Sequence, residues 1–217
     1  MGSTRKDIAS LRQDYSLAFL LETDVHPDPV EQFRLWFHEA VEAEIDDVNA
    51  MTLSTSDENA KPHSRIVLLK GLEENQFVFF TNYDSHKGKE LSQNPHVSLV
   101  FYWKELQRQV RIEGMAEKIR AAESTLYYHS RPKESQIGAW ASAQSEVLSG
   151  REELEARFKT LQEKYQDTEV PKPPHWGGYA VKPTLIEFWQ GRSSRLHDRL
   201  CYSLQLGGQW EMKRLNP

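Results

Sequence analysis

The spacing of apolar residues changes at Ala50 from the period of a helix to that of a β-strand, and this change constrains the fold most. Five stretches after this point are alternating or continuously apolar, and most are joined by short polar turns. They predict strands over 50–55, 62–70, 76–81, 96–103 and 106–117. Because the connections are short, we expect antiparallel pairing.

Helical spacing precedes and interrupts these strands. Asp28 can cap a helix whose first position is Pro29. The apolar face of this helix is predicted to consist of Val30, Phe33, Phe37 and Val41. Further helices are expected over 5–21, within the segment DSHKGKELSQNP at 84–95, over 120–130 and over 150–166.

The last strands are predicted between residues 178 and 215. Strands that are interrupted by helices and closed by a hairpin fit a mainly β member of the α+β class, in which helices pack outside a small antiparallel barrel. The 217 residues, 38% of them hydrophobic, can bury the core of one domain. We expect this domain to cover 25–217 and residues 1–24 to form a separate N-terminal segment.

The composition argues against several classes of protein. A formal net charge of -5 disfavours nonspecific nucleic-acid binding, which needs a basic surface. Cys201 is the single cysteine, which excludes an internal disulfide, and no apolar run is long enough to span a bilayer. No histidine pair has metal-ligand spacing, and neither GxGxxG nor GxSxG occurs. We therefore expect a cytoplasmic protein without a metal site, a Rossmann nucleotide site or a membrane segment.

A cationic row is predicted in the stretch IEFWQGRSSRLHDR, from Ile186 to Arg199. The stretch is typical of two strands around a turn, which would place Arg195, His197 and Arg199 on one strand face. Neighbouring guanidinium groups repel unless an anion lies between them, so the row could bind a phosphate. Taken alone, the row is better explained by a solvated edge strand with screened charges.

Two other stretches could bind phosphate. In SRIVLLK, Arg65 and Lys70 are five apart and would point to opposite faces of a strand unless a bulge intervenes. They would then serve different ligand groups; alternatively, they only flank a buried strand. In FFTNYDSHKGKE, Thr81 ends a strand, and His86 and Lys87 stand at the start of a helix. Helix amides and nearby lysines suit a phosphate, although a polar helix entry looks the same.

Amide and clamp residues complete the candidate chemistry. In LQRQVRIEG, one strand face would carry Gln107, Gln109, Arg111 and Glu113. The amides suit the mixed donor and acceptor edge of a heterocycle such as a flavin, or simply solvent. Tyr127, Arg131 and Ser135 could clamp a phosphate, or could belong to a capped helix end. Such clusters suit two phosphates and two aromatic rings, so the chemistry would be supplied by a cofactor.

The motifs taken together carry a resemblance. RIVLLK, FFTN with SHK, RQVRIEG, YYHSRPKESQIGAW, QS at 144 and 145, WGGY, EFWQG and RLHDR make the chain similar to the pyridoxine 5'-phosphate oxidase family. The resemblance runs from about Leu11 to Pro217. It implies a Greek-key FMN-binding split barrel and a homodimer with FMN at the interface. The implied reaction oxidises pyridoxine 5'-phosphate or pyridoxamine 5'-phosphate with O2 to pyridoxal 5'-phosphate and hydrogen peroxide.

The resemblance also implies roles for individual residues. The FMN contacts would be Arg65, Ile66, Lys70, Phe80, Thr81, His86, Lys87, Gln109, Gln144, Ser145, Trp189 and Arg199. The substrate contacts would be Arg12, Tyr15, Lys70, Tyr127, Arg131, Ser135, Arg195 and His197. Arg195 and His197 would be catalytic, lying over the substrate ring, and the 1–24 segment would cover the site. Asp47 matches an acidic position near the substrate.

One residue departs from the family pattern. His86 in SHK stands where the family often has arginine, and free histidine titrates near pH ~6.5, so one phosphate contact would be weaker or pH-dependent. This departure favours an alternative function, a split-barrel protein that holds FMN or pyridoxal phosphate without turnover. A more distant alternative is an oligonucleotide-binding barrel that stacks bases on its aromatic residues, which the net charge of -5 disfavours.

Overall fold

The structure is a computed structural model that describes residues 14–217. These residues form two compact units that alternate along the sequence. The first, called here the terminal unit, contains the chain up to Val48 together with Phe101–Arg111 and Leu185–Pro217. The second, the central unit, contains Asn49–Val100 and Ile112–Thr184. Each unit is described by itself below.

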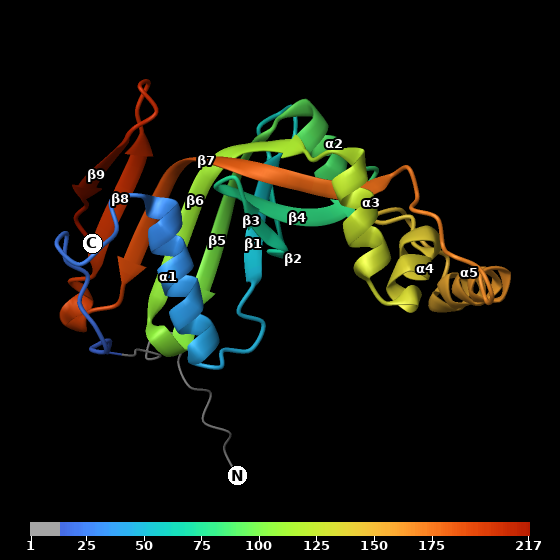
Figure 1. The fold of residues 1–217 in the computed structure, drawn as a ribbon, viewed down its shortest axis with the longest axis horizontal. Coiled ribbons are helices and arrows are strands. Elements are labelled where there is room, and N and C mark those ends of the chain that lie inside the picture. Colours follow the sequence, from blue (N-terminus) through green and yellow to red (C-terminus); the bar gives the residue numbers. More distant parts are fainter. Residues whose placement is uncertain (1–13) are drawn as a thin grey trace, which may run out of the picture. The chain divides into compact units, whose positions relative to one another are not determined.

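The strands of the described residues belong to one sheet (Figure 1). Its strands are β1 (Ala50–Ser56), β2 (Pro62–Leu68), β3 (Gly71–Glu73), β4 (Gln76–Asn82), β5 (His96–Trp103), β6 (Arg108–Lys118), β7 (Trp176–Gln190), β8 (Asp198–Leu204) and β9 (Trp210–Arg214). The order is β2-β1-β5-β6-β7-β4-β3, with β8 beside β7 and β9 beside β8.

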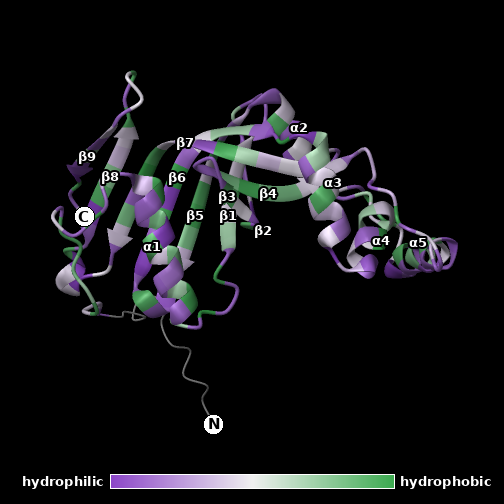
Figure 2. Ribbon diagram, viewed as in Figure 1, coloured by the Kyte–Doolittle hydropathy of each residue, from purple (hydrophilic) through white to green (hydrophobic). Residues whose placement is uncertain are grey.

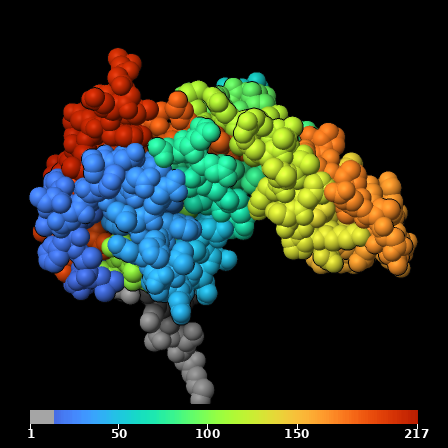
Figure 3. All heavy atoms as spheres, viewed as in Figure 1, coloured from blue at the N-terminus to red at the C-terminus, as the bar shows by residue number. Residues whose placement is uncertain are grey.

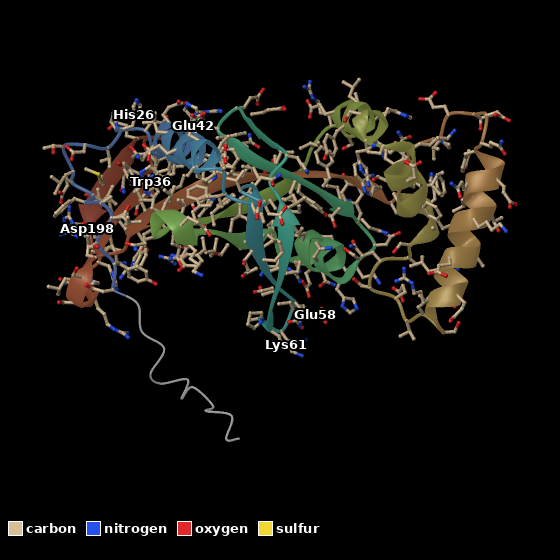
Figure 4. The ribbon with its side chains drawn as sticks, turned by 90° about the horizontal axis from the view of Figure 1, so that it is seen from below. His26, Trp36, Glu42, Glu58, Lys61 and Asp198 are labelled. Atoms are coloured by element: carbon tan, nitrogen blue, oxygen red, sulfur yellow. The ribbon has the colours of Figure 1, made fainter. Side chains whose placement is uncertain are left out.

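Antiparallel pairing holds within each unit, as the short connections predict. In the central unit, β1 pairs with β2 with Ala50 opposite Leu68, and β4 pairs with β7 with Phe77 opposite Val181. In the terminal unit, β7 continues as the partner of β8, and β9 follows as a hairpin. The turn between β1 and β2 carries Glu58 and Lys61, which are labelled in Figure 4.

The helices are α1 (Pro29–Glu42), α2 (His86–Gln93), α3 (Ala121–Ser130), α4 (Lys133–Ala141) and α5 (Arg151–Lys164). The predicted start of α1 is confirmed, because Asp28 Oδ1 accepts a hydrogen bond from the Val30 amide at 2.8 Å. Its buried face includes Phe33 and Trp36, whose rings lie 5.0 Å from Phe101 and 5.1 Å from Phe188, respectively. Trp36 is labelled in Figure 4.

The predicted apolar face of α1 was wrong at one position. Val41 is 45% exposed, whereas Trp36 and Ala40 are buried. Residues three and four apart share a helical face, and Phe33, Trp36 and Ala40 follow that spacing better than Val41 does.

The three helices α3, α4 and α5 gather into one cluster in the central unit (Figure 3, yellow to orange). Its apolar core consists of Tyr128, Ile137, Tyr165, Val170 and Trp176. Most of α5 is hydrophilic (Figure 2), and none of its residues is buried. Partly buried Phe158 and Leu161 attach α5 to this core, while the charged residues remain in solvent.

Several predicted boundaries hold and others do not. The strands predicted from the change of period are present, but β2 ends at Leu68, and β3 and α4 were not predicted. The described part of the helix expected over 5–21 is not helical. Its backbone amides bond to distant side chains instead: Ser16 and Leu17 donate to Gln107 Oε1 at 3.0 and 3.3 Å, and Leu20 donates to Asp198 Oδ2 at 3.2 Å. These bonds occupy groups that a helix would use internally.

Within residues 14–217, no helix is both long enough and apolar enough to cross a membrane.

Candidate functional site

A cavity of about 1010 Å³ lies in the central unit and gathers most of the predicted site residues. Those that line it are Arg65, Ile66, Lys70, Phe80, Thr81, His86, Lys87, Tyr127, Arg131, Ser135, Gln144 and Ser145. Most of them come from β2, β4, α2, α3, α4 and the loop after α4, whereas Lys70 lies between β2 and β3, and Arg131 directly follows α3. Its volume is at the upper end of the range for small-molecule sites, ~300–1,000 Å³.

The start of α2 forms part of this cavity. Ser85 caps the helix, and its hydroxyl accepts a hydrogen bond from the Gly88 amide. Gly88 is required here, because a Cβ at this position would lie 2.1 Å from the carbonyl oxygen of Tyr83. The close approach fixes the first turn of the helix against the preceding loop, and it places His86 and Lys87 at the cavity.

Lys87 is a buried cation in the cavity. Its Nζ donates to Thr81 Oγ1 and Gln144 Oε1, both at 3.1 Å, and to Ser85 Oγ at 3.4 Å. Burial and then the charge of Arg65 lower the pKa of Lys87 to about 8, against the opposing effect of Glu90. A cation with a lowered pKa and only neutral hydrogen-bond partners is suited to bind an anion.

A buried network holds Arg65. Its Nη1 donates to Thr55 Oγ1 at 2.5 Å and to the Leu53 carbonyl at 3.3 Å, and its Nη2 donates to Glu90 Oε2 at 3.4 Å. Thr55 in turn donates to Glu90 Oε2 at 2.5 Å. The other carboxylate oxygen of Glu90 lies 2.7 Å from Nδ1 of His63. Arg65 is therefore oriented by the protein before any ligand binds.

Arg65 and Lys70 line the same cavity, but only Arg65 lies on β2, so the prediction that both lie on one strand was wrong. The strand alternation does not reach Lys70, because β2 ends at Leu68. The Leu69 amide bonds to Asn49, whereas the Lys70 amide bonds to the Val78 carbonyl at 2.8 Å. With this change of hydrogen-bond partner, the direction of the backbone changes between the two residues.

Stacked aromatic rings form another part of the cavity. The Phe80 ring lies 3.8 Å from that of Tyr127 and 5.3 Å from that of Trp176, and both pairs are nearly parallel. The Arg131 guanidinium lies 4.8 Å from the centre of the Trp176 ring. Its Nη1 is buried and has no hydrogen-bond partner in the described residues. Burial lowers the pKa of Arg131, although the group stays charged.

The predicted phosphate clamp is brought together as expected. Tyr127 lies on α3, Arg131 is the residue at which this helix ends, and Ser135 lies in the first turn of α4. All three line the cavity. A buried donor without a partner costs free energy, so the unpaired Arg131 Nη1 indicates where an anion would bind.

Other predicted site residues lie in the terminal unit. The His197 ring is 4.6 Å from that of Trp189 and 5.9 Å from that of Tyr15. His197 Nδ1 accepts a hydrogen bond from the Arg192 amide at 3.1 Å, so the neutral imidazole carries its proton on Nε2. Burial and then the charge of Arg195 lower the pKa of His197, against the effect of Asp198. At neutral pH, this histidine offers one N–H donor.

The cationic row predicted for one strand face is not present. β8 begins at Asp198, and Arg195 lies in a 3-10 turn with a φ of 61°. The tight turn places Arg195 outside the strand alternation that would align it with Arg199. Arg195 is exposed.

Arg199 forms a bidentate pair with Glu187 instead of facing another cation. Its Nε and Nη2 donate to the two carboxylate oxygens at 2.8 and 3.1 Å, and its Nη1 donates to the Asn216 carbonyl at 2.8 Å. Burial alone would raise the pKa of Glu187, but Arg199 and Arg111 hold it below its ordinary value.

The amide face of β6 is partly confirmed. Gln109, Arg111 and Glu113 are half-buried and alternate with buried Val110 and Ile112. Gln107 precedes the strand in a left-handed conformation with a φ of 53°, where its side chain binds the segment at 16–17. Gln109 belongs to the terminal unit and is not among the residues that line the central cavity. Arg12 lies outside the described residues.

Comparison with known proteins decides the family. The model described as "Pyridoxamine 5'-phosphate oxidase" matches residues 37–165, and that of the "Pyridoxine 5'-phosphate oxidase C-terminal dimerisation region" matches 176–217. A pyridoxine/pyridoxamine 5'-phosphate oxidase from Cyanothece sp. is 56% identical over 97% of this chain and 98% of its own length. One from Salinibacter ruber is 54% identical over 97% and 99%.

The chain belongs to the pyridoxine/pyridoxamine 5'-phosphate oxidase family. Among solved structures, PhzG from Burkholderia lata, in complex with tetrahydrophenazine-1-carboxylic acid, has a TM-score of 0.88 at 28% identity over 94% of this chain and 100% of its own. An FMN-binding protein from Nostoc punctiforme has a TM-score of 0.73 at 16% identity over 89% and 100%, which supports the split-barrel fold. In this oxidase family member, the terminal unit contains residues 185–217 of the matched dimerisation region.

Sequence reasoning missed several residues that line the central cavity or contact predicted site residues, among them Glu90, Trp176 and Glu187. Glu90 and Trp176 support or line the central cavity, and Glu187 holds Arg199. Glu90 follows Lys87 by three positions on a helix, a spacing that could have suggested a charge partner. Glu187 alternates with buried Ile186 and Phe188, and an acidic residue next to such positions could have suggested a buried pair. Trp176 carried no such signal.

Proposed function

We propose that this protein catalyses the FMN-dependent oxidation of pyridoxine 5'-phosphate and pyridoxamine 5'-phosphate by O2 to pyridoxal 5'-phosphate. One observation carries this proposal. A single cavity contains two cationic groups from different elements, Arg65 with Lys87 and Arg131 with Tyr127, beside stacked aromatic rings. That set of side chains suits two phosphorylated ligands with flat rings, which are a flavin mononucleotide and a phosphorylated pyridine.

The residues present fit FMN. Lys87 is held only by neutral oxygen atoms, which a phosphate can replace with a stronger, charge-assisted bond. Arg65 has its guanidinium braced on one side by Thr55 and Glu90, which leaves further N–H groups to donate. When bound, FMN would supply the redox chemistry, because it can accept two electrons from the substrate and pass them to O2.

We assign the substrate phosphate to the second cationic group. Arg131 would donate its unpaired Nη1 to this phosphate, with Tyr127, Ser135 and Lys70 as further donors. The Trp176 ring beneath the guanidinium keeps it oriented. The residues thereby fix one end of the substrate, and such positioning lowers the barrier by removing motion that would otherwise have to be lost during the reaction.

We further propose that Trp189, Arg195, His197, Arg199 and Gln109 reach the cofactor and substrate from the partner chain of a homodimer. The matched dimerisation region, which includes the first four of these residues, supports this arrangement. In it, Arg195 and the Nε2–H of His197 would donate to polar groups of the substrate ring. The residues at 1–24, with Arg12 and Tyr15, would cover the site.

The overall reaction balances without a further reactant for the alcohol. The substrate loses two hydrogen atoms as its alcohol becomes an aldehyde, and O2 gains them as hydrogen peroxide. For the amine, the same two-electron oxidation gives an imine, which water hydrolyses to the aldehyde and ammonia.

Purified protein with FMN and either substrate in air should therefore form pyridoxal 5'-phosphate and peroxide in equal amounts. FMN binding without either product would instead identify a non-catalytic flavin carrier.

Mixed dimers test the proposed interface. Lys87→Met would disable the central cavity, and Arg195→Ala would disable the group from the other chain, so each homodimer should be inactive. When the two variants are mixed, unfolded and refolded together, one site in each mixed dimer would contain both intact residues, and activity should return. If both residues of a site came from the same chain, the mixture would remain inactive.

A further inference from the structure

Glu90 is an acidic residue buried beside a site that should bind anions. Glu90 is 7% exposed and lies in the second turn of α2, one turn after Lys87. A carboxylate in such a place weakens anion binding by its own charge, and burying it costs free energy unless it is well paired. Another role of Glu90 must therefore offset the weakened anion binding and the free energy that its burial costs.

The geometry of Glu90 provides that role through Arg65. Glu90 Oε2 accepts from Thr55 at 2.5 Å and from Arg65 Nη2 at 3.4 Å, and the Thr55 hydroxyl accepts from Arg65 Nη1 at 2.5 Å. Three elements, β1, β2 and α2, thus meet at one guanidinium. Arg65 cannot turn away from this position without breaking several hydrogen bonds at once.

The carboxylate of Glu90 also balances the positive charges around it. Arg65 and His63 face it from β2, Lys87 precedes it on α2, and Thr55 of β1 is uncharged. Arg65 disfavours the charged form of Lys87, and Glu90 favours it. Without the carboxylate, half-buried Arg65 and buried Lys87 would repel each other, and the lysine is the one that can lose its proton.

We propose that Glu90 is a positioning residue for the cofactor phosphate: its buried carboxylate fixes the Arg65 guanidinium and balances the charges of Arg65 and Lys87, so that both cations act on one phosphate group. This inference rests on the proposed function, because the phosphate in question is that of FMN. Glu90 itself does not touch the ligand in this role.

A merely structural role for Glu90 predicts a different set of effects. If the carboxylate only joined α2 to the sheet, its loss would lower the unfolding temperature and leave the pH dependence of FMN binding unchanged. A positioning role instead couples Glu90 to the protonation of Lys87. The pH dependence of FMN binding therefore separates the two roles. Glu90→Asp, which keeps the charge, should show the pH dependence of the wild type.

The first experiment measures FMN affinity from about pH 6 to about pH 9 by quenching of flavin fluorescence, for the wild type, Glu90→Gln and Glu90→Asp. Glu146→Gln is the matched control, since Glu146 forms an exposed ion pair with Lys89 of the same helix. We expect Glu90→Gln to bind FMN about tenfold more weakly at neutral pH, and to lose affinity with rising pH earlier than the wild type. Glu90→Asp should keep the pH profile of the wild type, and Glu146→Gln should change neither property.

The second experiment needs no flavin. The rate at which an amine-reactive acylating reagent modifies Lys87 is followed against pH by peptide mass spectrometry in the same proteins. The midpoint should move to lower pH in Glu90→Gln and stay unchanged in Glu146→Gln. An unchanged midpoint, or FMN binding by Glu90→Gln with the affinity and pH profile of the wild type, overturns the role of Glu90.

The two proposals can fail separately. A wild-type protein that binds no FMN contradicts the proposed function, and the modification of Lys87 then still decides whether Glu90 controls that lysine. If Glu90→Gln does not fold, as judged by circular dichroism, Glu90→Asp decides. Its shorter side chain should weaken FMN binding by losing contact with Arg65 while the Lys87 midpoint stays in place, and FMN affinity equal to that of the wild type overturns the proposal.

Discussion

The ammonium group of Lys87 lies 3.1 Å from the side-chain oxygen of Gln144, although the two residues are 57 positions apart in the sequence. The contact joins the start of α2 to the loop after α4 and closes one part of the central cavity. Both partners are predicted FMN contacts, and a phosphate oxygen would be a stronger acceptor for Lys87 than the amide is. Much of the proposed cofactor site is thus assembled within one unit.

Lys87→Met should abolish tight FMN binding, and the wild type should show a pH dependence that this variant lacks. The phosphate favours the charged lysine, whose pKa burial lowers to about 8, so affinity should be full at lower pH and fall as the pH rises through that value. Fluorescence titrations across this range measure both effects. Lys89→Gln, which removes an exposed lysine of the same helix, should behave like the wild type.

His86→Arg should tighten FMN binding. His86 is exposed and lines the cavity, and an arginine in its place would always be charged and could donate two parallel hydrogen bonds. The dissociation constant should fall by up to about tenfold, corresponding to ~1.4 kcal/mol. His96→Arg adds the same charge at an exposed position on β5 as a control. Equal affinities for His86→Arg and the wild type at every pH would mean that residue 86 does not reach the phosphate.

Arg131→Ala should impair substrate binding while FMN remains bound. Its buried Nη1 has no partner in the described residues, and losing a charge-assisted hydrogen bond typically costs ~1.5–3 kcal/mol. We therefore expect kcat/KM to fall by roughly one to two decades, mainly through KM. Arg131→Lys should recover little, because a lysine lacks the planar group that stacks on Trp176. Release of FMN by Arg131→Ala would instead assign this arginine to the cofactor.

Arg199→Ala should destabilise the fold, whereas Arg195→Ala should not. Removing Arg199 leaves the buried Glu187 with one fewer cation, a change that can cost ~3–5 kcal/mol, reduced here because Arg111 remains. Arg195 is exposed, so its loss should alter the free energy of unfolding by less than about 0.5 kcal/mol and lower turnover instead. Urea unfolding and steady-state kinetics separate the two effects. Equal stability of both variants would contradict the role given to the Glu187 pair.

The sequence predicted elements better than it predicted how side chains are aimed. Alternation identified strands such as β1, in which every second residue is buried, and Asp28 with Pro29 identified the start of α1. The prediction that Arg65 and Lys70 lie on one strand and point to opposite faces failed because β2 ends early and the backbone then bonds to β4. Such a change of partner depends on tertiary contacts that no local pattern contains.

The arginine row failed for a related reason. Arg195 and Arg199 are four apart, but the tight turn before β8 breaks the alternation, and Glu187 captures Arg199 from the neighbouring strand. The helix expected over 5–21 is absent from its described part, residues 14–21, where Gln107, about 90 residues away, accepts hydrogen bonds from the amides of Ser16 and Leu17. Long-range side-chain bonds of this kind compete with local propensity and are invisible in a single sequence.

The most direct test of the proposed FMN-dependent oxidation is a half-reaction without oxygen. The FMN-loaded protein is mixed with pyridoxine 5'-phosphate under strict exclusion of O2, and the yellow absorbance of the flavin is followed together with pyridoxal 5'-phosphate. We expect the colour to disappear as about one equivalent of pyridoxal 5'-phosphate forms per flavin. It should return with release of peroxide when air is admitted. A flavin that stays yellow beside bound but unchanged substrate, in a protein that holds FMN tightly, would contradict the assignment as an oxidase.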